Sequence, residues 1–187
     1  MTETGAQLYA RLVSDSYWIE ADEAQFGEDF IPSAWRPWLL HRDSLTTALI
    51  EFSQDNFRVQ VLSEQWATPE DREAHRLNCP AGEKAMIREV ELVCNEQVTV
   101  YARSIIPASL FNSEPDTFVG LGSKPLGHLL FKDGRARFSR RAISTYTAED
   151  GPALYGRTTP YEFHGGEILV SEFFVNGDLI RNSSPNQ

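Results

Sequence analysis

Two neighbouring segments in which apolar and polar residues alternate constrain the fold more than any other feature of this sequence. They span residues 85–94 and 98–106 and flank a short polar turn at 95–97. Alternation with a period of two is typical of a β-strand with one buried face, and strands joined by so short a turn pair antiparallel. The sequence therefore predicts a β-hairpin, whose second strand ends at Pro107.

The rest of the chain adds further strands through short connections. A helix is predicted to begin at Asp43 or Ser44, either of which can cap it, and to run to residue 53. The other predicted elements are strands at 57–62, 137–146, 156–163 and 167–175 and short helices at 68–73 and 125–131. Few of these helices are long enough to connect parallel strands, so the pattern favours an antiparallel α+β domain.

Composition and charge narrow the function classes. The chain has 187 residues, a length that suits one domain over residues 1–187 with frayed ends. Its 17 Lys and Arg stand against 27 Asp and Glu, and the net charge of −10 argues against a general nucleic-acid binder, which needs an excess of cations. No apolar run resembles a signal peptide or reaches the length of a membrane span, so we expect a cytoplasmic soluble protein.

Residues that commonly hold a metal or a nucleotide are sparse. Cys79 and Cys94 are too few for a disulfide scaffold or a four-thiolate zinc site, and we expect two reduced thiols. The histidines at positions 41, 75, 128 and 164 lack ligand spacing, and the glycines at 120–122 are expected to form a simple turn. The sequence thus gives no indication of a metal or an organic cofactor.

Two predicted strands each carry a single charged residue in an otherwise apolar row. Arg88 shares a face with Met86, Val90, Leu92 and Cys94, and Glu172 shares one with Ile168, Val170 and Phe174. A charge on an apolar face must be paired, bound to a ligand or placed at a solvent edge. Two interpretations fit: Arg88 and Glu172 pair with each other or reach water, or they mark the two ends of a dry pocket. Such a pocket would suit a small carboxylate that carries a hydroxyl.

Six short motifs occur in the order seen in one enzyme family. They lie at residues 38–46, 87–90 with the following hairpin, 102–107, 124–131, 156–157 and 169–174. Each is weak alone, but together they span about residues 30–176, and on them the chain resembles the chorismate lyase family. The resemblance implies a carbon–oxygen lyase that converts chorismate to 4-hydroxybenzoate and pyruvate for ubiquinone biosynthesis, without a metal or cofactor.

The resemblance also implies a fold and a set of site residues. The expected fold is α+β, a single antiparallel sheet with inserted helices that form flaps over an enclosed site, and a monomer is expected. By position, the family's catalytic arginine for the product carboxylate falls on Arg88, and its glutamate for the product hydroxyl falls on Glu172. Leu45 and Leu126 match the flap contacts, and Arg103 matches a second arginine, expected at the entrance of the site.

The sequence also fits a second class of function, the binding of a small ligand without catalysis. The UTRA-type effector-sensing domains of bacterial transcription regulators resemble the same fold and bind small ligands without chemistry. They normally follow a basic helix-turn-helix, whereas the segment before residue 30 is short and acidic. A stand-alone ligand-binding module is therefore the alternative to an enzyme.

Overall fold

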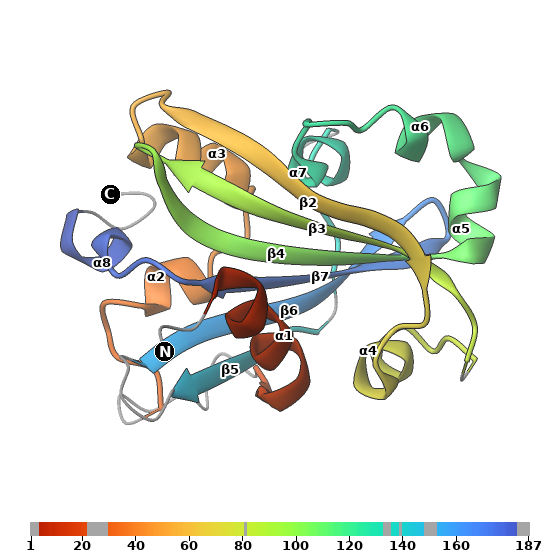
Figure 1. Ribbon diagram of the computed structural model, residues 1–187, viewed down its shortest axis with the longest axis horizontal. Helices are drawn as coiled ribbons and strands as arrows, with labels where there is room; N and C mark the ends of the chain where they lie inside the picture. The colour runs from red at the N-terminus through yellow and green to blue at the C-terminus, as the bar shows by residue number, and fades with distance from the viewer. Residues whose placement is uncertain are drawn as a thin grey trace.

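Seven strands form one antiparallel sheet in the computed structural model, in the order β1-β5-β6-β7-β4-β3-β2 (Figure 1). The structure describes residues 4–21, 30–80, 82–132, 136–138, 140–147 and 153–182. The strands are β1 (Tyr17–Glu20), β2 (Phe57–Ala67), β3 (Ala85–Cys94), β4 (Gln97–Pro107), β5 (Ala142–Thr147), β6 (Ala153–Phe163) and β7 (Gly166–Phe174). The helices are α1 (Gly5–Asp15), α2 (Arg36–Leu39), α3 (Leu45–Phe52), α4 (Asp71–Arg76), α5 (Ala108–Ser113), α6 (Pro115–Val119), α7 (Leu126–Leu130) and α8 (Asp178–Asn182). The predicted α+β class with a single antiparallel sheet is confirmed.

The predicted hairpin is present as β3 and β4. Ala85 pairs with Pro107 at one end and Cys94 with Gln97 at the other. Asn95 and Glu96 make the turn with φ of 50° and 63°. A two-residue hairpin turn needs this left-handed conformation to match the right-handed twist of its strands. The hairpin therefore places β3, with Arg88, between β4 and the edge strand β2.

The helix at the site begins where its cap predicts. The Ser44 hydroxyl accepts a hydrogen bond from the Thr47 amide, so α3 begins at Leu45. By contrast, α4 begins at Asp71 rather than 68, because the capping contact is made by Glu70, whose amide donates to the Glu73 carboxylate at 2.9 Å. The N-terminal helix α1, capped by Thr4, was not predicted.

Strand β1 was not predicted, and three boundaries of the predicted strands differ by three residues or more. Strand β2 continues five residues beyond position 62, because a bulge between Val61 and Ser63 interrupts the alternation without ending the pairing. Strand β5 begins at Ala142 rather than 137, opposite the end of its partner β1 at Glu20. Strand β6 begins at Ala153 rather than 156, because it pairs with β5 as far as Thr147.

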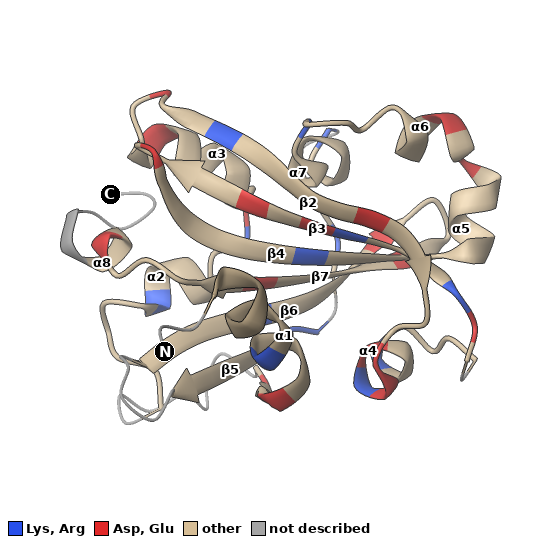
Figure 2. Ribbon diagram, in the orientation of Figure 1, with Lys and Arg blue, Asp and Glu red and all other residues tan. Residues whose placement is uncertain are grey.

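Helices cover both faces of the sheet (Figure 1). Helix α1 packs Leu12 on Tyr101 and Phe173, and α4 lies on the same side. Helices α2 and α3 cover the opposite face, where Trp38 and Leu49 join the core formed with Val90, Leu92 and Phe174. In the residues that the structure describes, no helix has the length and apolar character needed to cross a membrane. Charged positions occur within the sheet, on β2, β3, β4 and β7, as well as at its margins (Figure 2).

Candidate active site

A cavity lies between the sheet and the helices α3 and α7. The sheet lines it with residues of β2, β3, β4, β6 and β7, and the helical layer covers it with residues 45–46, 125–127 and 130–131. The lining contains all four predicted binding residues, which are Leu45, Arg88, Leu126 and Glu172. Most of the lining is apolar, and Arg88 and Glu172 are its charged members among the described residues. The four positions expected from the strand pattern and the family resemblance therefore line one cavity.

Arg88 is held in place by the turn that precedes α7. Its side chain is 3 % exposed, and its Nη2 donates to the carbonyl oxygens of Gly122 at 2.8 Å and Lys124 at 3.1 Å. Its Nη1 pairs with Glu64 of the neighbouring strand β2. The turn can present this carbonyl because Gly122 has φ of +49°, a conformation that glycine adopts without steric cost. The glycines at 120–122 are a turn, as predicted, and the turn also positions Arg88.

Glu172 is paired with a different arginine. Arg157 stands opposite it on β6 and donates from Nε to Glu172 Oε2 at 2.5 Å. The Arg157 side chain is fully buried, and its Nη1 donates to the carbonyl oxygens of Trp38 at 2.8 Å and His41 at 3.0 Å. Arg88 and Glu172 therefore do not neutralise each other. Each has its own partner on a neighbouring strand, while both line the same cavity.

A second buried guanidinium lies beside Arg157. Arg141 donates from Nε to the Thr159 hydroxyl at 3.0 Å and from Nη1 to the His41 carbonyl at 2.7 Å. Burial and the neighbouring charge of Arg157 lower the pKa of Arg141 to about 10, so it stays protonated at neutral pH. Burial also opposes the charge on Arg157, but the carboxylate of Glu172 outweighs it and raises the pKa of Arg157. Two protonated arginines, Arg141 and Arg157, therefore lie together beside the single carboxylate of Glu172.

The two covering helices touch each other above the cavity. Leu45 begins α3 and Leu126 begins α7, and both are buried. A Cβ atom on Gly127 would lie only 2.6 Å from the Thr46 hydroxyl oxygen, so only glycine allows this approach of α7 to α3. The cover is thus a close-packed contact between two short helices.

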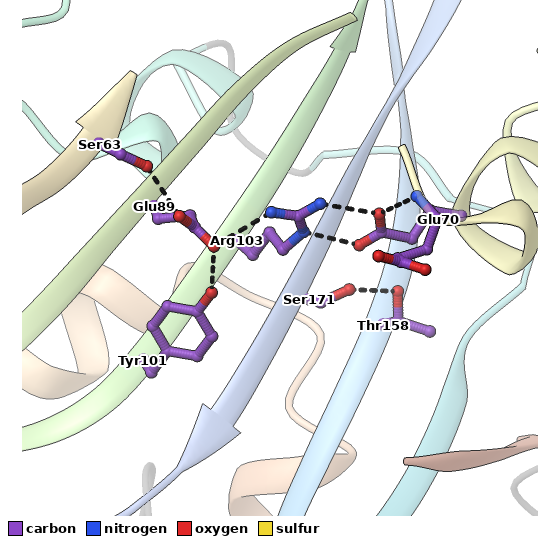
Figure 3. A network of polar contacts seen from close by, with 8 residues as sticks. Ser63, Glu70, Glu89, Tyr101, Arg103, Thr158 and Ser171 are labelled. Atoms are coloured by element: carbon purple, nitrogen blue, oxygen red, sulfur yellow. Dashed lines mark hydrogen bonds and ion pairs between the residues drawn. The ribbon is translucent and has the colours of Figure 1, made fainter. Parts of the chain in front are cut away.

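Arg103 does not lie at this cavity, and the expectation of an entrance position does not fit its surroundings. It occupies the other face of the sheet, where its Nε donates to Glu73 at 2.8 Å and its Nη1 to Glu89 at 3.0 Å (Figure 3). Alternation explains the difference, because Ala102 and Ser104 on the same strand line the cavity and the residue between them must face away. The position of Arg103 makes it part of the contact between α4 and the sheet.

The groups around Arg103 form one hydrogen-bonded network (Figure 3). Glu89 accepts from the hydroxyls of Tyr101 at 2.5 Å and Ser63 at 2.7 Å. Burial opposes the charge of Glu89, but these hydroxyls and Arg103 outweigh it, and the pKa of Glu89 is lowered. For Tyr101, burial and the hydrogen bond to Glu89 both raise the pKa. These groups are hydrogen-bonded to one another and do not line the cavity on the opposite face.

Three residues near the cavity were not predicted. Arg157 lies in one of the six family motifs, which assigns it no role, and neither Glu64 nor Arg141 stands out in the sequence. A signal for Arg157 exists, since it alternates with Tyr155, Thr159 and Tyr161 in a strand and is the single charge in that buried row. Cys79 and Cys94 are free thiols, as predicted. No group of three or more potential metal ligands occurs among the described residues.

Comparison with protein families gives one clear match. The family described as chorismate lyase matches residues 12–183, a wider span than the motifs at 30–176. A probable chorismate pyruvate-lyase of Methylococcus capsulatus is 34 % identical over 152 residues, which cover 74 % of this chain and 92 % of that protein. Proteins with the same description are 36 % identical in Aromatoleum aromaticum (78 % and 86 % covered) and 30 % identical in Pseudomonas aeruginosa (87 % and 92 % covered).

Solved structures resemble the fold at much lower identity. The ligand-binding domain of a putative GntR-family transcriptional regulator from Bordetella bronchiseptica has a TM-score of 0.50 at 15 % identity, covering 65 % of this chain and 85 % of that one. A possible transcriptional regulator, YydK, from Bacillus subtilis has a TM-score of 0.50 at 13 % identity, covering 68 % of this chain and 60 % of that one. These similarities concern the fold alone.

Proposed function

Because the chain belongs to the chorismate lyase family, we propose that it eliminates pyruvate from chorismate and leaves 4-hydroxybenzoate. The observation that carries this proposal is the placement of Arg88 and Glu172 in one largely apolar cavity, each anchored by its own partner. A cation and a hydrogen-bond acceptor in such a cavity suit a ring with a carboxylate and a hydroxyl. In this proposal the product serves ubiquinone biosynthesis, as the family resemblance implies.

The proposed reaction needs little from the protein beyond positioning. Chorismate carries a ring carboxylate, a hydroxyl on C4 and an enolpyruvyl ether on C3. The C4–H bond breaks and its electrons complete the aromatic ring as the C3–O bond breaks. The C3–O pair becomes the carbonyl of pyruvate, and the C4 proton goes to the methylene carbon of the leaving group. Because the substrate accepts its own proton, no external base and no cofactor is required.

Two side chains would orient the ring for this step. Arg88 binds the ring carboxylate, and Glu172 accepts a hydrogen bond from the C4 hydroxyl, an interaction that strengthens as this hydroxyl becomes phenolic. The apolar walls contributed by residues such as Leu45, Leu126 and Val90 exclude water and hold the side chain of the substrate over C4. The product keeps both polar contacts after pyruvate has left, so we propose that 4-hydroxybenzoate is retained and inhibits.

A binding module without chemistry is the second candidate. The observation in its favour is the likeness of the fold to the ligand-binding domain of the Bordetella bronchiseptica regulator. That likeness covers 65 % of this chain at 15 % identity, whereas the family match covers residues 12–183. The family match therefore favours the enzyme over the binding module.

Pyruvate release separates the two candidates. The purified protein is incubated with chorismate, pyruvate is followed by coupled reduction to lactate, and 4-hydroxybenzoate is quantified by chromatography. The proposal expects the two products in equal amounts, with the same rate after treatment with a chelator. Binding of 4-hydroxybenzoate without release of pyruvate would establish the module instead. Activity that is lost with the chelator and restored by a divalent ion would contradict the cofactor-free mechanism.

A further inference from the structure

The two oxygens of the Glu172 carboxylate have different surroundings. Its Oε2 accepts from Arg157, while none of the hydrogen bonds among the described residues involves its Oε1. Glu172 lines the cavity, whereas Arg157 lies behind it and is fully buried. One oxygen is thus fixed by the protein and the other is available to a ligand.

Arg157 itself has little freedom to move. Its Nη1 is fixed by the carbonyl oxygens of Trp38 in α2 and of His41 in the segment between α2 and α3. Its Nη2 is buried without a hydrogen-bond partner among the described residues. A planar guanidinium held on Nη1 keeps its Nε direction fixed, so the bond to Glu172 has a defined geometry.

Arg157, and not the neighbouring Arg141, is the direct hydrogen-bond partner of Glu172. Arg141 lies next to Arg157 but donates to Thr159, to the Tyr161 hydroxyl and to backbone carbonyls rather than to Glu172. Among the described residues, Glu172 is the carboxylate that accepts a hydrogen bond from Arg157, and Arg141 makes no bond to it. Arg141 therefore offers a matched control, since it is a second buried arginine of the same cluster without that contact.

We propose that Arg157 is a positioning residue, which holds the Glu172 carboxylate by Oε2 so that Oε1 accepts the hydrogen bond of the substrate's ring hydroxyl. This inference deepens the proposed function and rests on it. A carboxylate without this anchor would rotate about its terminal bond, and a displacement of about 1 Å weakens both binding and the orientation of the reacting bonds. Arg157 acts through Glu172 and need not touch the substrate.

The test compares two ligands that differ by one hydroxyl. The dissociation constants of 4-hydroxybenzoate and benzoate are measured by calorimetry, and their ratio defines hydroxyl selectivity. A hydrogen bond to a carboxylate predicts a ratio of roughly 10- to 100-fold for the parent. Arg157→Lys keeps the charge, but an ammonium cannot reach Glu172 and both carbonyl oxygens with the same geometry, so the ratio should fall at least threefold. Arg141→Lys should leave the ratio within twofold of the parent.

A smaller fall in Arg157→Lys, or an equal fall in Arg141→Lys, would overturn the proposal. If Arg157→Lys does not fold, thermal unfolding of Arg157→Met is compared with Arg157→Met combined with Glu172→Gln. Recovery of Tm in the pair shows that Arg157 serves the carboxylate. No recovery assigns it to the carbonyls of residues 38 and 41 and overturns the inference.

The same measurements distinguish this inference from the proposed function. A parent that prefers 4-hydroxybenzoate over benzoate but releases no pyruvate from chorismate contradicts the function and supports the role of Arg157 in binding. A parent that releases pyruvate but binds both ligands equally contradicts the role of Arg157. Absence of binding and of turnover contradicts both.

Discussion

Replacing Arg88 or Arg103 by glutamine should damage the protein in two different ways. The arginines occupy adjacent strands, but Arg88 lines the cavity and Arg103 joins α4 to the opposite face. Arg88→Gln is therefore expected to weaken 4-hydroxybenzoate binding, and Arg103→Gln to lower stability. The same substitution on two faces of one sheet makes each variant the control of the other.

The magnitudes follow from the partners of each side chain. A charge-assisted hydrogen bond from Arg88 to a carboxylate in an apolar cavity stands at the upper end of about 1.5–3 kcal/mol, or at least ~10²-fold in Kd. Its structural partner Glu64 is 42 % exposed and can turn to water, so the cost in stability is small. Removing Arg103 leaves Glu73, 8 % exposed, without its partner, at a cost of about 3 kcal/mol. For a chain of this size that corresponds to a fall in Tm of roughly 6–12 °C.

Calorimetric titration with 4-hydroxybenzoate and thermal unfolding by circular dichroism measure the two effects. We expect Arg88→Gln to lose at least ~10²-fold in affinity, with less than half the change in Tm of Arg103→Gln. Arg103→Gln should bind within about threefold of the parent at a temperature where it is folded. Unchanged affinity in folded Arg88→Gln would remove Arg88 from the site and refute the assignment of the cavity.

Further predictions concern the cover of the cavity, the acid side of the stability curve and the fate of the product. Gly127→Ala should reduce kcat/KM, because the added Cβ would lie 2.6 Å from the Thr46 hydroxyl oxygen. Adding Thr46→Ala to this variant should restore part of kcat/KM, and no restoration would refute a clash between the helices. Leu126→Ser should raise the Kd of 4-hydroxybenzoate by opening the apolar cover, and an unchanged Kd would show that this residue does not seal the site. Burial and the nearby Arg157 lower the pKa of His41, so the unfolded chain binds its proton first and stability falls as the pH drops below about 6.5. His41→Gln should lose less of its free energy of unfolding between pH 7.5 and 5.5 than the parent, as measured by urea denaturation. Progress curves with added 4-hydroxybenzoate should slow in a competitive manner, whereas linear turnover in a large excess would contradict retention of the product.

The sequence predicted those parts of the fold that depend on local patterns. The β3–β4 hairpin and the start of α3 at its Ser44 cap are set by alternation and by capping within a few residues. Helix α1 was not predicted, although Thr4 and Gln7 form a local capping box at its start. Tertiary contacts also stabilise this helix, since Leu12 is buried on Tyr101 and Tyr9 stacks on the same ring at 4.1 Å.

The sequence pointed only to charged residues that line the cavity, and not to their partners. Arg88 and Glu172 were identifiable because a single charge in an apolar strand face needs an explanation. Their partners Glu64 and Arg157 lie 24 and 15 residues away in sequence, and the pairing depends on strand order and register. Arg103 fits a family pattern but faces the other way, since a match by position does not test which side of the sheet a side chain occupies.

The bulge in β2 shows how register decides which charge meets the site. In β2, Val59 lines the cavity, and regular alternation would then place Ser63 on the cavity face and Glu64 on the opposite face. The extra residue between Val61 and Ser63 reverses that order, so Ser63 donates to Glu89 on the network side and Glu64 reaches Arg88. Without the bulge, Arg88 would lose its carboxylate partner, and Glu64 would add a negative charge next to Glu89. One inserted residue thus gives Glu89 on one face and Arg88 on the other their β2 partners. It is also the reason why the alternation of this strand is no longer visible in the sequence after residue 62.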